Sequence, residues 1–166
     1  PERISGPAEY KKRPRPAVSV VDLQRQIHAL INKERRKHGL SPLAWDETLS
    51  RIARKHSQDM AKRDYFSHYS PEGRDFSYRY KQEGYQCVVP AQENSYYTGA
   101  ENIFQNNLYD RVVMVNGAKY YDWNSEKKIA ETTVEGWMNS PGHRKNILTP
   151  YWKKEGIGVA VSPDDK

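Results

Sequence analysis

Apolar residues follow a helical period through most of this chain and a strand period only in its second half. Leu23, Ile27 and Ile31 recur every four residues, which predicts a helix over 22–37 with Asp22 as its N-cap. Similar spacing predicts four further helical segments, over residues 46–63, 75–83, 125–139 and 143–148. A chain with this many amphipathic helices must bury their apolar faces against one another or against a sheet.

Strand signals are few and come late. The dipeptide Asn116-Gly117 separates the β-prone runs 111–115 and 118–123, which predicts a hairpin with a type I′ turn. The run Gly-Ile-Gly-Val-Ala-Val at 156–161 predicts a strand in the core. Because helices outnumber strands and do not alternate with them, we expect an α+β or layered α/β/α domain, not a doubly wound parallel sheet.

The basic charge is concentrated in the first residues. Half of the formal net charge of +6 lies in residues 1–17, which contain five basic and two acidic side chains. Residues 1–18 are rich in proline and lack apolar periodicity, so we expect a basic linker or tail there and one domain over 19–166. Such a tail is either a solvated linker or a segment attracted to anionic polymers and membrane surfaces.

Other function classes are disfavoured by what the sequence contains. No run approaches the length of a membrane-spanning helix, so no transmembrane segment is expected in this chain. Basic residues do not alternate with aromatic residues in the pattern typical of nucleic-acid binding, and we expect no nucleic-acid partner. Cys87 is the only cysteine, which excludes an intrachain disulfide and predicts a partly buried structural thiol.

Four motifs in a fixed order are more specific than any one of them. They are HSQDM at 56–60, YFSHYSPEG at 65–73, GAENI at 99–103 and WMNSPGHRKNIL at 137–148. Together with the opening LINKERRKHGLSPL at 30–43 and the late Gly-Ile-Gly-Val-Ala run, they resemble the CAP superfamily in its prokaryotic, SCP-like form. The resemblance covers about residues 20–162.

This resemblance implies a three-layer α-β-α sandwich with a cleft that holds two histidines and two acidic residues. His68 matches the first histidine, Glu101 the first acid and His143 the second histidine. The second acid of the animal, plant and fungal members falls on Ser140 here. Glu135 is an alternative, but helical spacing turns it about 160° away from Trp137. We therefore expect only three of the four cleft residues of the family to be present in this chain.

Two further departures from the family concern the strands. The chain is longer than compact prokaryotic members between Glu101 and Trp137, and the hairpin at Asn116-Gly117 is expected to be an insertion there. The family usually adds a strand after the run at 156–161, whereas this sequence reaches only Lys166. Either that strand is trimmed, or the inserted hairpin replaces it.

The candidate cleft supports three kinds of chemistry. Two neutral imidazoles and a carboxylate can bind Zn²⁺ or another divalent cation and leave one position for water, with His68, Glu101 and His143 as ligands. The same groups can instead hydrogen-bond one another and pin three loops together. A catalytic role for these residues stays open, but no Ser-His-Asp or Cys-His arrangement is recognisable.

Five further polar side chains have structural interpretations. His56, on the apolar face of its helix, is expected to be a core histidine, whereas His28 and His38 are expected at the surface. Asn102 and Asn146 are expected to fasten loops through bonds to the backbone.

The function that these expectations favour is an extracellular or cell-surface binding or interaction domain. Its ligand would be a cell-envelope polymer, a peptide or a lipid. The alternative is a metal-dependent hydrolase that acts on peptide or cell-envelope material. The two functions differ in whether the cleft holds a metal ion and activates a nucleophile.

Overall fold

The computed structural model describes residues 12–166. Its helices are α1 (Val20–Lys37), α2 (Glu47–Arg63), α3 (Phe76–Gln82), α4 (Glu126–Met138) and α5 (Pro141–Leu148). Helices α2, α3 and α4 begin where the sequence predicted, and their N-caps Asp46, Asp75 and Ser125 each accept a hydrogen bond from the first turn. The predicted cap of the first helix is wrong, because Ser19 accepts a bond from the backbone N–H of Asp22 and the helix starts earlier.

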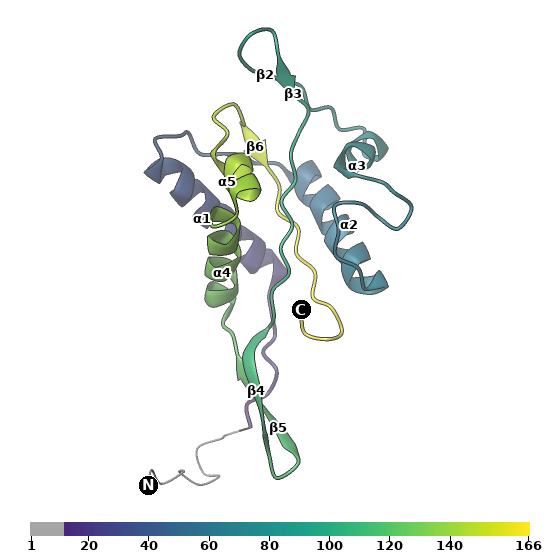
Figure 1. Cartoon of the computed structure of the whole chain (residues 1–166), viewed down its shortest axis with the longest axis vertical. Helices are drawn as coiled ribbons and strands as arrows, with labels where there is room; N and C mark the ends of the chain where they lie inside the picture. Colours follow the sequence, from purple (N-terminus) through teal and green to yellow (C-terminus); the bar gives the residue numbers. More distant parts are fainter. Residues whose placement is uncertain (1–11) are drawn as a thin grey trace.

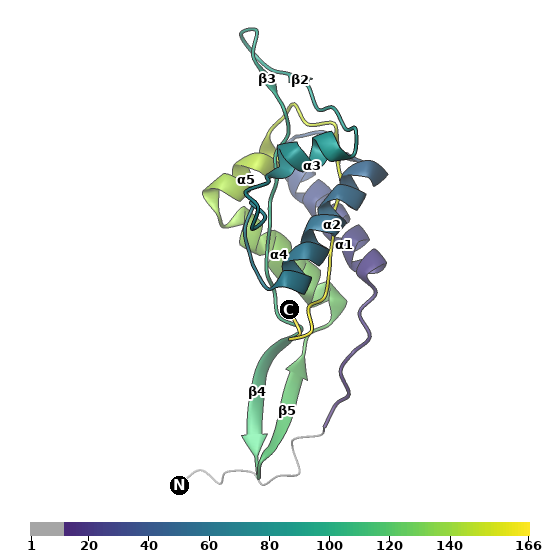
Figure 2. The same ribbon diagram turned by 90° about the vertical axis from the view of Figure 1, so that its right-hand side faces the viewer.

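The elements form three layers, as the α+β sandwich prediction requires (Figure 1). Helices α1, α4 and α5 make one outer layer, and α2 and α3 make the other. Between them run two long segments of chain, residues 98–108 and 155–162. Figure 2, turned by 90°, shows α2 and α3 in front of α1 and α4, with the same two segments between the layers.

Regular strand pairing is sparse in the described part of the chain. β1 (Ala44–Trp45) and β6 (Lys154–Glu155) pair in parallel, and β2 (Val89–Pro90) pairs antiparallel with β3 (Tyr96–Tyr97). The predicted hairpin is confirmed as β4 (Tyr109–Val115) and β5 (Ala118–Trp123), with Asn116 and Gly117 both at positive φ. It projects away from the three layers and pairs with no other strand among residues 12–166.

The predicted strand at 156–161 is not formed as a paired strand, and we correct that prediction. The segment lies against α2 so closely that a Cβ added to Gly158 would come within 2.0 Å of the backbone N of Arg54. Its backbone bonds go to side chains: the carbonyls of Ile157 and Gly158 accept from the hydroxyls of Ser50 and Ser57. The apolar side chains of the segment lie in the core, as predicted, but no strand among residues 12–166 pairs with it.

The core lies between α1, α4 and the segment at 156–161. Its buried members include Leu23, Ile27, Ile129, Trp137 and Ile157. Trp137 is in this cluster, as its place on the Ile129 stripe predicted, and its indole N–H donates to the carbonyl of Ile103. This bond ties α4 to the segment at 98–108 and so fixes the position of Glu101 two residues earlier.

The part of the predicted tail that the structure describes lies against the domain. The indole N–H of Trp123 donates to the carbonyl of Arg13, and the Arg15 guanidinium pairs with Asp165 at 2.5 Å. The rest of the tail, residues 1–11, lies outside the described residues, and the boundary at 18 stays a prediction. Within residues 12–166, no helix is both long and apolar enough to cross a bilayer.

Candidate functional site

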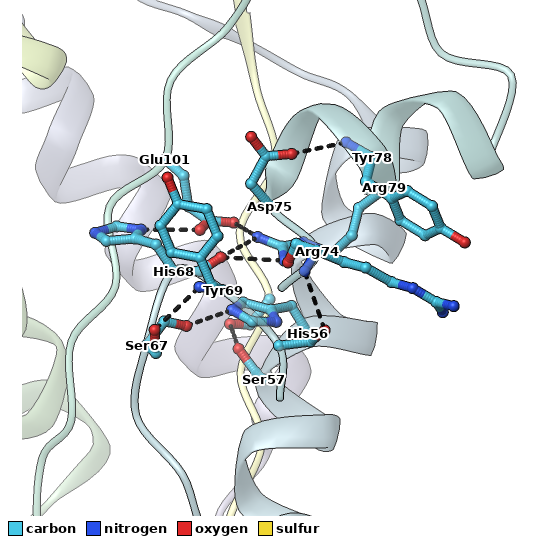
Figure 3. A network of polar contacts seen from close by, with 12 residues as sticks. His56, Ser57, Ser67, His68, Tyr69, Arg74, Asp75, Tyr78, Arg79 and Glu101 are labelled. Atoms are coloured by element: carbon cyan, nitrogen blue, oxygen red, sulfur yellow. Dashed lines mark hydrogen bonds and ion pairs between the residues drawn. The ribbon is translucent and has the colours of Figure 1, made fainter. Parts of the chain in front are cut away.

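Four elements bring polar side chains to one place beside α2 and α3. His68 lies in the loop between α2 and α3, Arg79 on α3, Glu101 on the segment at 98–108 and His143 in the first turn of α5. We call His68, Arg79, Glu101 and His143 the polar cluster. Figure 3 shows how the side chains of His68 and Arg79 converge on the carboxylate of Glu101.

The carboxylate of Glu101 is engaged on both oxygens. Its Oε1 lies 2.9 Å from Nδ1 of His68, and its Oε2 accepts a hydrogen bond from Nη2 of Arg79 at 2.5 Å. The side chains of Glu101 and Arg79 are each only 14% exposed, so their ion pair is shielded from water. Charge-assisted bonds in such surroundings are strong, and they fix the carboxylate in one orientation.

Arg79 is the functional residue that the sequence interpretation missed. Its guanidinium also donates to the carbonyls of His68 and Arg74, which shape the loop before α3. Its Nε is buried and has no hydrogen-bond partner among residues 12–166. One signal was present in the sequence, because Arg79 follows the inward-facing Phe76 by three residues and therefore shares its face of the helix.

The two predicted histidines lie near enough to each other to interact electrostatically. Burial lowers the pKa of His143, and the nearby positive charge of a protonated His68 lowers it further. The remaining candidates for the second acid do not join them. Glu135 is exposed on α4 and has no hydrogen bond to the polar cluster, and Ser140 is the N-cap residue of α5. Three of the four expected cleft residues therefore come together, with Arg79 in addition.

The structural interpretation of His56 is confirmed. The side chain is 4% exposed, and its Nε2 donates to the carbonyl of Ser67 at 2.9 Å. Burial, followed by the charge of Arg79, lowers the pKa of His56 and so favours the neutral ring. His56 thus supports the loop that carries His68 from below, as Figure 3 shows.

The expected loop fasteners are also present. Asn102 donates to the carbonyl of His143 at 3.1 Å, and Asn146 donates to the side-chain oxygen of Asn102 at 2.8 Å. Both asparagines connect the segment carrying Glu101 to α5. One prediction nearby is wrong: His28 is half-buried and not a surface residue, because its Nδ1 lies 2.5 Å from the carboxylate of Glu155.

The polar cluster does not fit a three-ligand zinc centre. Within the described residues 12–166, no three His, Cys, Asp or Glu side chains are placed so that they could hold a metal ion together. One oxygen of the Glu101 carboxylate is paired with the guanidinium of Arg79. This group is always positively charged and repels a metal ion at short range. The imidazoles of His68 and His143 are the groups left for a metal ion, fewer than zinc sites in proteins use.

The sequence and the fold both match known proteins. Residues 28–166 match the CAP family, the Cysteine-rich secretory protein family. The chain is 38% identical over 145 residues to the uncharacterized protein YkwD of Bacillus subtilis, which covers 87% of this chain and 45% of that protein. It is 33% identical over 136 residues to the uncharacterized membrane protein YlbC of the same organism. This alignment covers 82% of this chain and 31% of that protein. The chain thus spans less than half the length of these curated relatives.

Two solved structures share the fold. An extracellular protein with an SCP domain from Bacillus anthracis has a TM-score of 0.57 and 26% identity, with 87% of this chain and 41% of that chain covered. A cysteine-rich secretory protein from Staphylococcus aureus has a TM-score of 0.53 and 18% identity, over 90% of this chain and 39% of that chain. With the family match across residues 28–166 and this shared architecture, the chain belongs to the CAP family.

Proposed function

We propose that the chain is an extracellular CAP-type binding domain and that the polar cluster is its recognition site. The observation that carries this proposal is the double engagement of Glu101 by His68 and Arg79. A carboxylate held in this way suits a positioning role, because each of its oxygens is already engaged by a side chain of the protein. The imidazoles of His68 and His143 are then the groups that meet one.

The geometry also supports a proposal for the chemistry of the ligand. When the ring of His68 is neutral, its hydrogen bond to the carboxylate of Glu101 keeps the proton on Nδ1, and Nε2 is then a hydrogen-bond acceptor. Tyr69, the next residue, is 59% exposed and offers an aromatic face beside it. A fixed acceptor beside an aromatic ring suits ligands with hydroxyl or amide N–H donors, and the polymers of a cell envelope carry both.

The alternative of a metal-dependent hydrolase remains a prediction without a feature that favours it. The described residues place no serine, threonine or cysteine side chain in a hydrogen bond with the rings of His56, His68 or His143. The ion pair between Arg79 and Glu101 works against a metal ion at the carboxylate. Binding without turnover is therefore the function that the arrangement supports best.

A binding experiment with isolated cell-envelope polymer tests the proposal. We expect the wild-type domain to be retained and His68→Ala and His143→Ala each to lose most of the retention. His38→Ala is the matched control, because it removes an exposed imidazole outside the polar cluster. Equal retention of all four proteins would place the binding elsewhere, and turnover of the polymer that depends on His143 would favour the hydrolase.

A further inference from the structure

A chain of hydrogen bonds fastens helix α1 to the strand pair formed by β1 and β6. The Nδ1 atom of His28 lies 2.5 Å from a carboxylate oxygen of Glu155 on β6, and its Nε2 atom lies 3.3 Å from the side-chain nitrogen of Asn32, one turn later on α1. Asn32 in turn bonds to both backbone groups of Leu43, the residue before β1. We call His28, Asn32 and Glu155 the latch. None of the three belongs to the polar cluster.

The backbone of Leu43 determines which way the amide of Asn32 faces. The N–H of Leu43 donates to Oδ1 of Asn32 at 2.7 Å, so the amide oxygen lies on that side. The Nδ2 atom is then the donor, and it donates to the carbonyl of Leu43 at 3.0 Å and to Nε2 of His28. Leu43 is buried in the core, and a turned amide would set donor against donor and acceptor against acceptor at its backbone.

The neutral ring of His28 therefore carries its proton on Nδ1. Because Nε2 accepts from Asn32, the single proton is on the other nitrogen, which donates it to the carboxylate of Glu155. Burial raises the pKa of Glu155, whereas its bond to His28 and the charge of Arg35 lower it. The charged side chains next to this pair are Arg35 of α1, Asp46 and Glu47 at the start of α2, and Lys154 of β6, which pairs with Asp46.

A second proton on the ring has no acceptor in this arrangement. Among the described residues, Asn32 is the only one that bonds to Nε2 of His28, and it does so with an N–H group. A proton on Nε2 would turn this bond into a repulsion between two donors. The added charge strengthens the contact with Glu155, so the ring stays in place. The amide of Asn32 must then turn or move away, and either change breaks its bonds to Leu43.

We propose that the latch is an acid-sensitive device, which holds residue 43 against α1 while the ring of His28 is neutral and releases it when the ring takes up a second proton. Release loosens the entry to β1, where the backbone N–H groups of Ala44 and Asp46 donate to the carbonyls of Lys153 and Glu155. The same strand pair leads directly into the segment at 156–161, so the effect reaches the middle layer of the domain. The proposal does not depend on the ligand of the polar cluster.

NMR spectroscopy of the whole 166-residue chain tests both halves of the proposal. At pH 7.5 we expect the ring of His28 to carry its proton on Nδ1, which a long-range correlation of proton and nitrogen signals identifies. Between pH 7.5 and 5 we expect the hydrogen-exchange protection of the Leu43 amide to fall about tenfold relative to that of Ile31, because one buried hydrogen bond is lost. Ile31 is buried on α1 and reports any change in global stability.

Two variants separate the latch from the other histidines. His28→Asn retains a donor near Glu155 but cannot take up a proton, so the protection of Leu43 relative to Ile31 should not depend on pH. Asn32→Asp replaces the amide donor with an acceptor, so this relative protection should rise as the pH falls. His38→Asn is the matched control, because His38 is exposed at the end of the same helix and bonds to Glu34 and Arg144 instead. It should respond as the wild type does.

Four results would overturn the proposal. A proton on Nε2 of His28 at pH 7.5 would contradict the orientation of Asn32. Protection of Leu43 that follows that of Ile31 down to pH 5 would show that no release occurs. A response of His28→Asn equal to that of the wild type would assign the effect to another group. The absence of a rise in Asn32→Asp would show that the amide does not oppose the proton. None of these results bears on whether the polar cluster binds polymer.

Discussion

The substitution Glu101→Gln tests whether the polar cluster stabilises the domain. The amide keeps the shape of the carboxylate but loses its charge, and one of its two terminal atoms becomes a donor that faces either His68 or Arg79. Removing one partner of a buried ion pair costs about 3–5 kcal/mol. Because Arg79 keeps its bonds to two carbonyl oxygens, and the amide oxygen still accepts one bond, we expect a smaller loss of about 2 kcal/mol.

Chemical denaturation followed by circular dichroism measures this loss directly. In a domain of this size, 2 kcal/mol corresponds to a fall of roughly 4–8 °C in melting temperature. Glu135→Gln is the matched control, because Glu135 is exposed on α4 and has no ion pair among the described residues. It should change the free energy of unfolding by less than about 0.5 kcal/mol. If the two variants are equally stable, Glu101 does not hold the site together.

Three further predictions follow from the pKa shifts, the glycine contacts and the charge of Arg79. Burial lowers the pKa of His56 and of His143, so the unfolded chain takes up protons more readily than the folded one. The melting temperature should therefore be highest above about pH 6.5, the ordinary pKa of histidine, and fall below it, as melting curves from pH 7.5 to 5 would show. Gly158→Ala should destabilise by about 3 kcal/mol in urea denaturation, because its Cβ would lie 2.0 Å from a backbone atom of α2, whereas Gly142→Ala has nothing within 4 Å and should be tolerated. Zn²⁺ should bind weakly in calorimetric titrations, and its affinity should be lower at pH 5 than at pH 7.5. The Arg79→Gln variant should bind Zn²⁺ more tightly than the wild type; equal affinities of the two proteins would show that the charge of Arg79 does not oppose the metal ion.

The helices and the hairpin could be predicted from the sequence because their signals are local. A period of 3.6 residues gave α1, α2 and α4, and the Asn116-Gly117 pair gave the turn between β4 and β5. The segment at 156–161 could not be predicted in the same way. Its apolar alternation indicates where the side chains go, but a strand also needs a neighbouring backbone, and the described chain places none beside it.

The candidate site was predictable only in part, for a related reason. His68, Glu101 and His143 were found through a resemblance in which each motif marks its own position. Arg79 carries no such motif, and its role depends on a contact with Glu101, 22 residues away in sequence. His28 was misplaced for the same reason, since its burial results from Glu155, 127 residues later. Pairs of charged side chains distant in sequence leave no periodic pattern to detect.

We propose that His68 and His143 meet the ligand and that Glu101 positions the ring of His68. The chain has five histidines, at positions 28, 38, 56, 68 and 143, so their ring signals in an NMR spectrum can be assigned individually. During titration with soluble fragments of cell-envelope polymer, we expect the signals of His68 and His143 to shift together and those of His28 and His38 to stay in place. Saturable binding that leaves the His68 and His143 signals unchanged would contradict this account.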